Sequence, residues 1–326
     1  MNNSHITRSA LTSISIGVFI LMTFTYAVQA ATSSQWVRVA DHAAFSERDS
    51  ADGAVFLGGI WISNAYRVEG AVRDLWNSSD GVTWTKALDN TPYDPYAEMA
   101  VFQNKLWAVK GSVWNSTDGV KWTQVCNKTP FGPRGFGKLV VFQDKLWRLD
   151  FGYGIWCSCD GVNWTRVLAK APYGQRTASA VTVYAGKLWL CGGSSTTRCS
   201  PLEEHYTNIA TYNDVWCSSD GANWTRVIEH APWLPRMWVL ACEYAGKLWI
   251  IGGFSNRETK NFADCWTTTD GMKWEEFKFE AMWSPRHQPT IYIFKDSLWL
   301  VGGDMWPPMM TNDVWKLTIP DGGKLK

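Results

Sequence analysis

The hydrophobic residues of the chain follow a unit that recurs along most of its length. In the copy that begins at Arg236, an apolar segment (238–244) leads through Ala-Gly-Lys into a second segment that ends in Gly-Gly (248–253). A shorter segment (264–268) then leads through Thr-Asp-Gly into a fourth (272–277). Short apolar runs separated by glycine and aspartate turns are typical of β-hairpins. Each unit therefore predicts four antiparallel strands.

Tryptophan marks equivalent positions in every unit of this chain, which contains 22 of them. The second segment always carries one, and successive copies are about 40 to 60 residues apart, close to the length of one propeller blade. These residues are Trp61, Trp107, Trp147, Trp189, Trp249 and Trp299. The spacing predicts an all-β fold, a six-bladed β-propeller with four antiparallel strands per blade.

The turn between the third and fourth strands is the most regular part of the unit. Five copies, such as DVWCSSDGANW (214–224), place two tryptophans on either side of an Asp-Gly pair. We expect a three-residue loop, residues 219–221 in this copy, with its glycine in the left-handed conformation. The two tryptophans should then face each other across the hairpin. Repetition indicates a structural hairpin rather than a catalytic motif.

The two ends of the repeat region complete each other. The last unit stops after NDVWKL (312–317), before a fourth strand, whereas QWVRV (35–39) reads as a fourth strand without the three before it. We predict that this N-terminal strand joins the last blade and closes the ring, which leaves no free sheet edge.

These units resemble the Kelch repeats of β-propellers such as the central domain of galactose oxidase. The resemblance rests on a strand-one arginine, the Gly-Gly of "LCGG", "IIGG" and "LVGG", and the later aromatic and tryptophan residues. The second and third units, with "AVKG" and "RLDFG", lack the Gly-Gly pair. The hairpin is similar to the Asp-box of sialidase-type propellers, which implies a fold element remote from any active site.

Two sets of residues are candidates for ligand binding on the face where strand one begins. The first set lies 13 residues before the strand-two tryptophan in five units, and comprises Arg48, Arg134, Arg176, Arg236 and Arg286. In the second unit Tyr96 takes the place of arginine. These arginines would ring the channel and capture an anionic ligand, or each would pair with nearby backbone or acid. The arginine recurs in five units, and a binding site rarely needs five copies, so pairing with nearby backbone or acid is the favoured interpretation.

The second set contains tryptophans outside the repeat positions. Trp233, Trp283 and Trp306 fall in loops of the same face, in the fifth and sixth units. They could stack on sugar rings or apolar side chains, or pack beneath the loops.

The remaining features bear on location and chemistry. With 31 Lys and Arg against 30 Asp and Glu, charge gives no support for nucleic-acid binding. Residues 1–30 read as a signal peptide, so we expect a secreted or periplasmic propeller domain (31–326), monomeric and without a stable membrane span after cleavage. An uncleaved anchor is the alternative.

Cysteine and histidine usage is sparse. Cys191 and Cys199 could form a loop disulfide, or remain free thiols. The histidines share no metal-binding spacing, so the sequence predicts no metal and no cofactor. We therefore expect a binding module whose ligand is an anionic carbohydrate or an acidic peptide, either a glycan or a protein. The alternative is a carbohydrate-active enzyme, a sialidase-like hydrolase or a sialic-acid mutarotase-like protein, and no catalytic residue is singled out.

Overall fold

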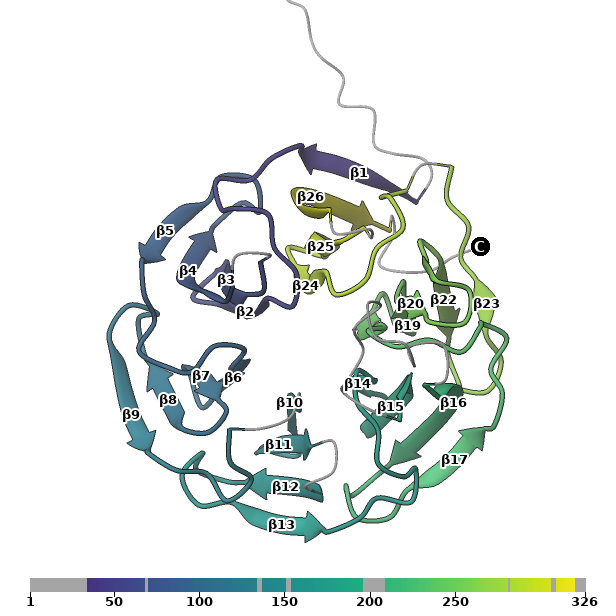
Figure 1. Cartoon of the computed structure of the whole chain (residues 1–326), viewed down its shortest axis with the longest axis horizontal. Helices are drawn as coiled ribbons and strands as arrows, with labels where there is room; N and C mark the ends of the chain where they lie inside the picture. The colour runs from purple at the N-terminus through teal and green to yellow at the C-terminus, as the bar shows by residue number, and fades with distance from the viewer. Residues whose placement is uncertain are drawn as a thin grey trace, which may run out of the picture. The chain divides into compact units, whose positions relative to one another are not determined.

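The computed structural model describes residues 34–67, 70–133, 137–150, 154–195, 209–280, 282–305 and 309–319. Within these ranges the propeller unit consists of six four-stranded antiparallel sheets, which stand as blades around a central axis (Figure 1). The predicted all-β, six-bladed fold is therefore confirmed. In the same ranges, no helix has both the length and the apolar character needed to cross a membrane. The predicted signal peptide lies outside the described residues and stays a prediction.

The strands of each blade follow one another from the axis outward. Blade 1 contains β2 (Asp52–Phe56), β3 (Gly59–Ala65), β4 (Val72–Ser78) and β5 (Thr85–Leu88). Blade 2 contains β6 (Glu98–Phe102), β7 (Lys105–Val109), β8 (Val113–Ser116) and β9 (Trp122–Cys126). Blade 3 contains β10 (Lys138–Phe142), β11 (Lys145–Asp150), β12 (Gly154–Ser158) and β13 (Thr165–Leu168).

The second half of the ring follows the same plan with one added hairpin. Blade 4 contains β14 (Ala180–Tyr184), β15 (Lys187–Ser194), β16 (Thr211–Ser218) and β17 (Thr225–Ile228). Blade 5 contains β18 (Leu240–Tyr244), β19 (Lys247–Ile251), β22 (Cys265–Thr268) and β23 (Glu275–Glu276), and carries the small hairpin of β20 (Phe254–Ser255) and β21 (Lys260–Asn261). Blade 6 contains β24 (Thr290–Phe294), β25 (Ser297–Asp304), β26 (Met310–Thr318) and β1 (Gln35–Ala40).

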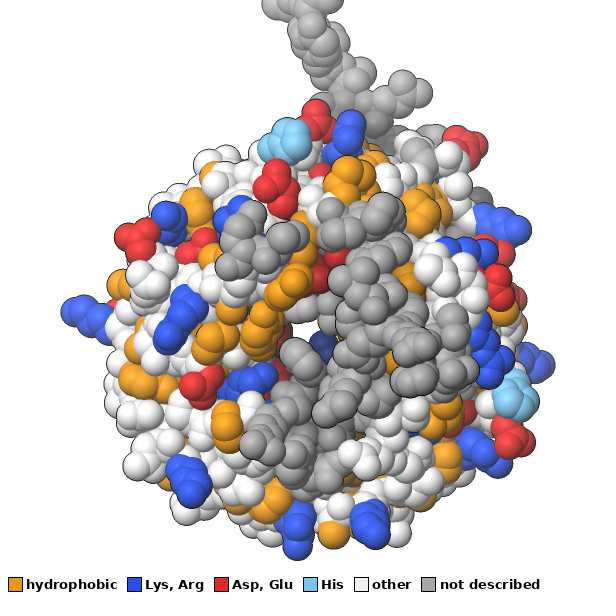
Figure 2. All heavy atoms as spheres, viewed as in Figure 1, with side chains coloured by type: hydrophobic (Ala, Val, Ile, Leu, Met, Phe, Trp, Pro, Cys, Tyr) orange, Lys and Arg blue, Asp and Glu red, His pale blue; other side chains and the backbone are white. Residues whose placement is uncertain are grey.

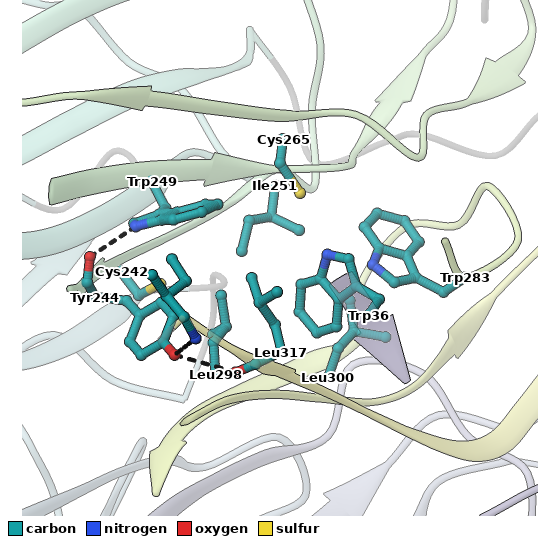
Figure 3. Close-up of a cluster of buried hydrophobic side chains, with 11 residues drawn as sticks. Trp36, Cys242, Tyr244, Trp249, Ile251, Cys265, Trp283, Leu298, Leu300 and Leu317 are labelled. Atoms are coloured by element: carbon teal, nitrogen blue, oxygen red, sulfur yellow. Dashed lines mark hydrogen bonds between the residues drawn. The ribbon is translucent and has the colours of Figure 1, made fainter. Parts of the chain in front are cut away.

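The first strand of the chain closes the ring, as predicted. β1 pairs antiparallel with β26, so that Trp36 lies opposite Leu317. The indole of Trp36 is 2% exposed and packs edge-on against Trp283, with Leu300 in the same cluster (Figure 3). An apolar side chain of this size contributes several kcal/mol when it is fully buried. Closure is thus held by packing as well as by strand pairing.

The strand-two tryptophans join neighbouring blades. The Trp147 ring is 3% exposed, and its Nε1 donates to the carbonyl of Phe142 at 2.9 Å. A Cβ atom added to Gly221 in the next blade would lie 2.1 Å from this ring, so only glycine fits there. The same contact pairs Gly81 with Trp299, Gly119 with Trp61, Gly161 with Trp107 and Gly271 with Trp189. The repeated Asp-Gly is therefore an inter-blade contact.

The hairpin itself differs from the prediction. Cys217 pairs with Thr225, so the loop is longer than three residues and the hairpin is centred on Gly221 rather than on Asp220, which places Trp216 opposite Arg226. The predicted face-to-face pair of Trp216 and Trp224 is therefore wrong. The longer loop sets the register, and side-chain hydrogen bonds hold that loop in place.

Two side chains hold the hairpin loop. The Oγ atom of Ser218 accepts a hydrogen bond from the amide of Gly221 at 2.8 Å. The Oδ1 atom of Asp220 accepts from the amides of Ala222 (2.9 Å) and Asn223 (2.7 Å). Hydrogen bonds from the Asn223 backbone and side chain, followed by the one from Ala222, lower the pKa of Asp220 to about 2. The aspartate is thus ionised to satisfy backbone donors of the turn.

Candidate functional site

The strand-one arginines are buried and paired. The guanidinium of Arg236 is 1% exposed and binds both carboxylate oxygens of Asp264, at 2.6 and 2.9 Å. It also donates to the carbonyls of Gly252 and Leu234, both at 3.0 Å. Equivalent bidentate pairs join Arg48 to Asp74, Arg176 to Asp214 and Arg286 to Asp313. These contacts favour the structural interpretation of the four arginines, while Arg134 lies outside the described residues.

The charge of each arginine stabilises its aspartate. Burial opposes ionisation of Asp313, but the hydrogen bonds and the charge of Arg286 outweigh it and lower the pKa of this carboxyl. The same balance lowers the pKa of Asp74 beside Arg48. Each guanidinium thus joins the start of strand one to strand three, and those of Arg176, Arg236 and Arg286 also bind the strand-two Gly-Gly. No carboxylate from a ligand is needed to complete these contacts.

Tyr96 does not occupy the arginine position. Its φ angle is +59°. The residues two positions after the arginines share this left-handed conformation, namely Ser50, Ala178, Trp238 and Gln288. The shorter connection therefore places Tyr96 two residues further along, beside the channel. Blade 2 has a different set of contacts in place of the arginine–aspartate pair. Ser112 Oγ donates to Asp94 Oδ2 and accepts from Trp114 Nε1.

Two of the candidate tryptophans are core residues. Trp233 is 2% exposed and packs edge-on against Trp274, with ring centroids 4.7 Å apart. Trp283 is 1% exposed and packs against Trp36. Other blades fill this position with Phe45, Tyr93, Phe131 and Tyr173, each of which contacts a tryptophan of its own blade. The interpretation that these tryptophans pack beneath loops is the one the contacts favour, and Trp306 lies outside the described residues.

The repeat does retain one variable position at the channel mouth. In four blades the residue after the arginine forms a single antiparallel bridge to a residue at the mouth end of its own blade. The pairs are Asp49 with Tyr66 in blade 1, Thr177 with Ser194 in blade 4, Met237 with Phe254 in blade 5, and His287 with Asp304 in blade 6. We call these positions the mouth bridges. The backbone is the same in all four, whereas the side chains range from apolar to charged.

The charged mouth bridges of blades 1 and 6 converge. Donor atoms of Asp49, His287 and Asp304 all lie within 4.8 Å of one another. The three residues are 5%, 5% and 6% exposed. Backbone hydrogen bonds from Gly303 to the Arg48 carbonyl (2.9 Å) and from Ser50 to the Gln288 carbonyl (3.3 Å) hold the two blades together at this point. We call these three residues the acidic triad.

His287 is held in one tautomer and one orientation. Asn261 donates through Nδ2 to the Asp304 carbonyl (3.0 Å), so its Oδ1 accepts from His287 Nδ1 (2.7 Å). The Trp238 ring stacks on the imidazole, with centroids 4.6 Å apart and planes at 20°. Burial lowers the pKa of His287 well below its ordinary value, although the charge of Asp304 opposes this effect. The neutral ring therefore carries its free lone pair on Nε2.

Asp49 is only partly satisfied by its neighbours. When the Gln288 amide is oriented to accept from Trp238 Nε1 (2.9 Å), its nitrogen lies 3.3 Å from Asp49 Oδ2. The Oδ1 atom of Asp49 is buried and has no hydrogen-bond partner among the residues that the structure describes. Burial raises the pKa of Asp49 to about 7, opposed by the hydrogen bond with Ser50 and supported by the charge of Asp304. A buried carboxylate oxygen without a donor is costly in free energy.

Aromatic residues lie beside the acidic triad. Tyr66, the bridge partner of Asp49, is 43% exposed. Tyr96 is partly buried, and burial together with the charges of Asp49 and Tyr66 raises its pKa. Trp238 completes the set. Figure 2 shows an opening at the centre of this face, bordered by hydrophobic, basic and acidic side chains. The mouth therefore combines ring faces with carboxylates.

Sequence reasoning missed the acidic triad because its members come from the two ends of the chain. Only ring closure brings Asp49 next to His287 and Asp304. A signal was nevertheless present, since Asp49 and His287 each follow a repeated arginine directly, at a position where other units have Thr177 and Met237. The residue after the arginine differs between blades, whereas the arginine itself recurs. A position that varies in this way is not determined by the fold and is available for function.

The proposed disulfide remains a prediction. Cys191 lies on β15, is 1% exposed and packs in the core between blades 4 and 5. Its suggested partner, Cys199, lies outside the described residues.

The ring and its mouth define the class of protein, a closed six-bladed β-propeller. The family model described as "DUF6242 beta propeller domain" matches residues 30–320, and the chain belongs to this family. A solved structure titled "Structure of YjhT" is similar, with a TM-score of 0.67 and 13% sequence identity over 87% of this chain and 98% of that chain. At this identity the likeness shows the fold alone. A search of curated proteins finds no match.

Proposed function

We propose that this protein is an exported propeller that binds a carbohydrate at the mouth of its central channel. The observation that carries the proposal is the meeting of three partly exposed aromatic rings, Tyr66, Tyr96 and Trp238, with the carboxylates of Asp49 and Asp304. Aromatic faces stack on the apolar faces of sugar rings, while carboxylates accept hydrogen bonds from sugar hydroxyls. A few polar groups among aromatic ones are typical of small-molecule sites.

The charges at the mouth argue for a neutral glycan. The four described strand-one arginines do not offer a free cationic group to an anionic sugar or an acidic peptide, because those at positions 48, 176, 236 and 286 already bind aspartates. This is a change from the anionic ligand expected from the sequence. Assignment to the Kelch type rests on the same arginines and on the Gly-Gly pairs that three of them bind.

A glycan array followed by calorimetry tests the proposal. We expect neutral oligosaccharides to bind, and Trp238→Ala to weaken the best of them at least about tenfold, since one stacking contact contributes on the order of 1 kcal/mol or more. Met272→Ala is the matched control, because Met272 is 60% exposed in the same blade but lies on the opposite face. Exclusive binding of anionic glycans, or unchanged affinity in Trp238→Ala, would contradict the proposal.

Export is tested separately. Mass spectrometry of the protein from the extracytoplasmic fraction should find a mature chain that begins at Ala31. An intact N-terminus in the membrane fraction would instead support an anchor.

A second candidate is a carbohydrate-active enzyme. It is favoured by the convergence of an imidazole and two carboxylates in the acidic triad, groups that commonly transfer protons. A sialidase-like reaction loses support because the four described strand-one arginines are paired, so exchange of sugar anomers is the reaction to test. Nuclear magnetic resonance should then show faster anomer exchange with the wild type than with Asp304→Asn. Equal rates in both proteins would exclude this role for Asp304.

A further inference from the structure

We propose that Asp49, His287 and Asp304 bind a divalent transition-metal ion, with Zn²⁺ and Mn²⁺ as the ions that suit the donor set. One imidazole nitrogen and two carboxylate oxygens form a mixed nitrogen and oxygen set without thiolate. Ca²⁺ and Mg²⁺ favour sites built from oxygen alone. The proposal does not depend on the identity of any sugar, because it concerns binding of the ion itself.

The geometry is close to that of a three-residue metal site. The three donor atoms lie within 4.8 Å of one another. Ligands bound at roughly 2.0–2.2 Å in a tetrahedron lie about 3.4 Å apart. The proposal therefore requires that the two aspartate side chains shift by about 1 Å when the ion binds. Three protein ligands leave at least one coordination position for water or for a hydroxyl of a bound molecule.

Two observations besides the acidic residues point to a cation. Asp49 is 5% exposed, and within the described part of the chain its Oδ1 atom has no hydrogen-bond partner. A cation would satisfy this oxygen. In addition, Asn261 Oδ1 accepts the Nδ1 proton of His287 at 2.7 Å and leaves Nε2 as the donor atom. Metal-binding histidines are generally fixed in this way by a partner on their other nitrogen.

The fold does not require these side chains. The equivalent bridge is formed by Thr177 and Ser194 in blade 4, and by Met237 and Phe254 in blade 5. The same backbone therefore accepts small polar or apolar residues. Burying the Asp49 carboxylate costs free energy, because its Oδ1 atom has no hydrogen-bond donor among the described residues. Neutral residues would fold at least as well, so the charged set is better explained by a ligand.

The experiment is metal binding to the mature chain stripped with a chelator. Calorimetry with Zn²⁺ and with Mn²⁺ should find one site, and the melting temperature should rise by several degrees in excess metal. Asp49→Asn and His287→Gln should each weaken binding at least tenfold. Thr177→Val, at the equivalent bridge of blade 4, should leave it unchanged. Melting of each variant in chelator verifies that it is folded.

Two further experiments test whether other side chains of the protein bind the metal. His230→Gln removes an exposed histidine and should not affect binding. Substitution with Co²⁺ should give a visible spectrum without thiolate-to-metal charge transfer, because the free cysteines are not part of the site. Absence of binding by Zn²⁺ and Mn²⁺, equal affinity in the Asp49 and His287 variants, or a thiolate band would each overturn the proposal. None of these outcomes involves a sugar, so failure here is distinct from failure of the carbohydrate proposal.

Discussion

The two faces of the propeller use repetition in opposite ways. On one face, five hairpins repeat the same hydrogen bonds from an aspartate and a hydroxyl side chain, such as those of Asp220 and Ser218, with Thr268 in place of serine in blade 5. On the other, the mouth bridges repeat only the backbone, and their side chains change from Met237 in blade 5 to His287 in blade 6. A side chain that recurs in each hairpin is explained by its role in the fold. Side chains that differ between blades on the same backbone, as at the mouth bridges, are better explained by function.

The sixth blade shows this contrast most clearly. It has no hairpin between its third and fourth strands, because β1 comes from the other end of the chain. The ring of Trp249 therefore has no hairpin glycine against it, and contacts Phe277 instead. The same blade supplies two of the three residues of the acidic triad. Blade 6 thus departs from the repeat on both faces.

The largest effect should come from removing the strand that replaces the missing hairpin. Deletion of residues 31–41 exposes the edge of β26 and removes Trp36, so we expect the melting temperature to fall by at least about 10 °C. Val37→Ala is the control, since this side chain on the same strand is 51% exposed. Calorimetry checks both proteins. A deletion variant that melts like the control would contradict closure by β1.

Breaking one arginine pair should have the next largest effect. Arg236→Ala leaves Asp264 partly buried without its partner, and we expect a loss of about 3–5 kcal/mol in the free energy of unfolding. Arg226→Ala breaks a pair with Glu229 in which both residues are largely exposed, and should cost less than about 1 kcal/mol. Urea denaturation measures both. Sugar binding by the folded Arg236 variant should be unchanged. A folded variant that no longer binds sugar would show that Arg236 is part of the ligand site.

The hairpin glycines offer a matched pair of substitutions. Gly221 and Gly246 both have positive φ angles, +74° and +71°. A Cβ at Gly221 meets the Trp147 ring at 2.1 Å, while one at Gly246 has nothing within 4 Å. We expect Gly246→Ala to cost about 1 kcal/mol from backbone strain, and Gly221→Ala about 3 kcal/mol because overpacking is added. Equal losses in urea denaturation would show that the inter-blade contact contributes little.

The smallest effect on stability should come from exchanging mouth bridges. The double variant His287→Met with Asp304→Phe gives blade 6 the bridge of blade 5, and we expect its unfolding free energy in chelator to stay within about 1.5 kcal/mol of the wild type. Metal binding should be lost altogether. A variant that fails to fold would mean that the triad is part of the framework, and a variant that still binds metal would exclude the triad as the site.

The sequence predicts the framework of this protein well and its site poorly. Blade number, strand order and closure follow from the spacing of tryptophans, because each repeat is a local unit that also packs locally. Trp216 does not face Trp224, because the hairpin is centred on Gly221 and its loop is longer than the symmetric spacing of the tryptophans about Asp220 indicates. The sequence leaves open whether Trp233 and Trp283 bind a ligand or pack beneath loops, because the shared aromatic position three residues before the arginine becomes evident only from the contacts of Phe45, Phe131 and Tyr173.

The pairing of β1 with β26 also sets the order in which the molecule can be completed. During synthesis β1 emerges first, and its partner strand emerges last. Pairing between the two ends of a chain has the largest loop-closure entropy to overcome, so it is a slow step. Until that step, β26 has an open edge to which another unclosed copy could add a strand. The time between translation of the first and the last strand is therefore the period in which this protein is most exposed to misassembly.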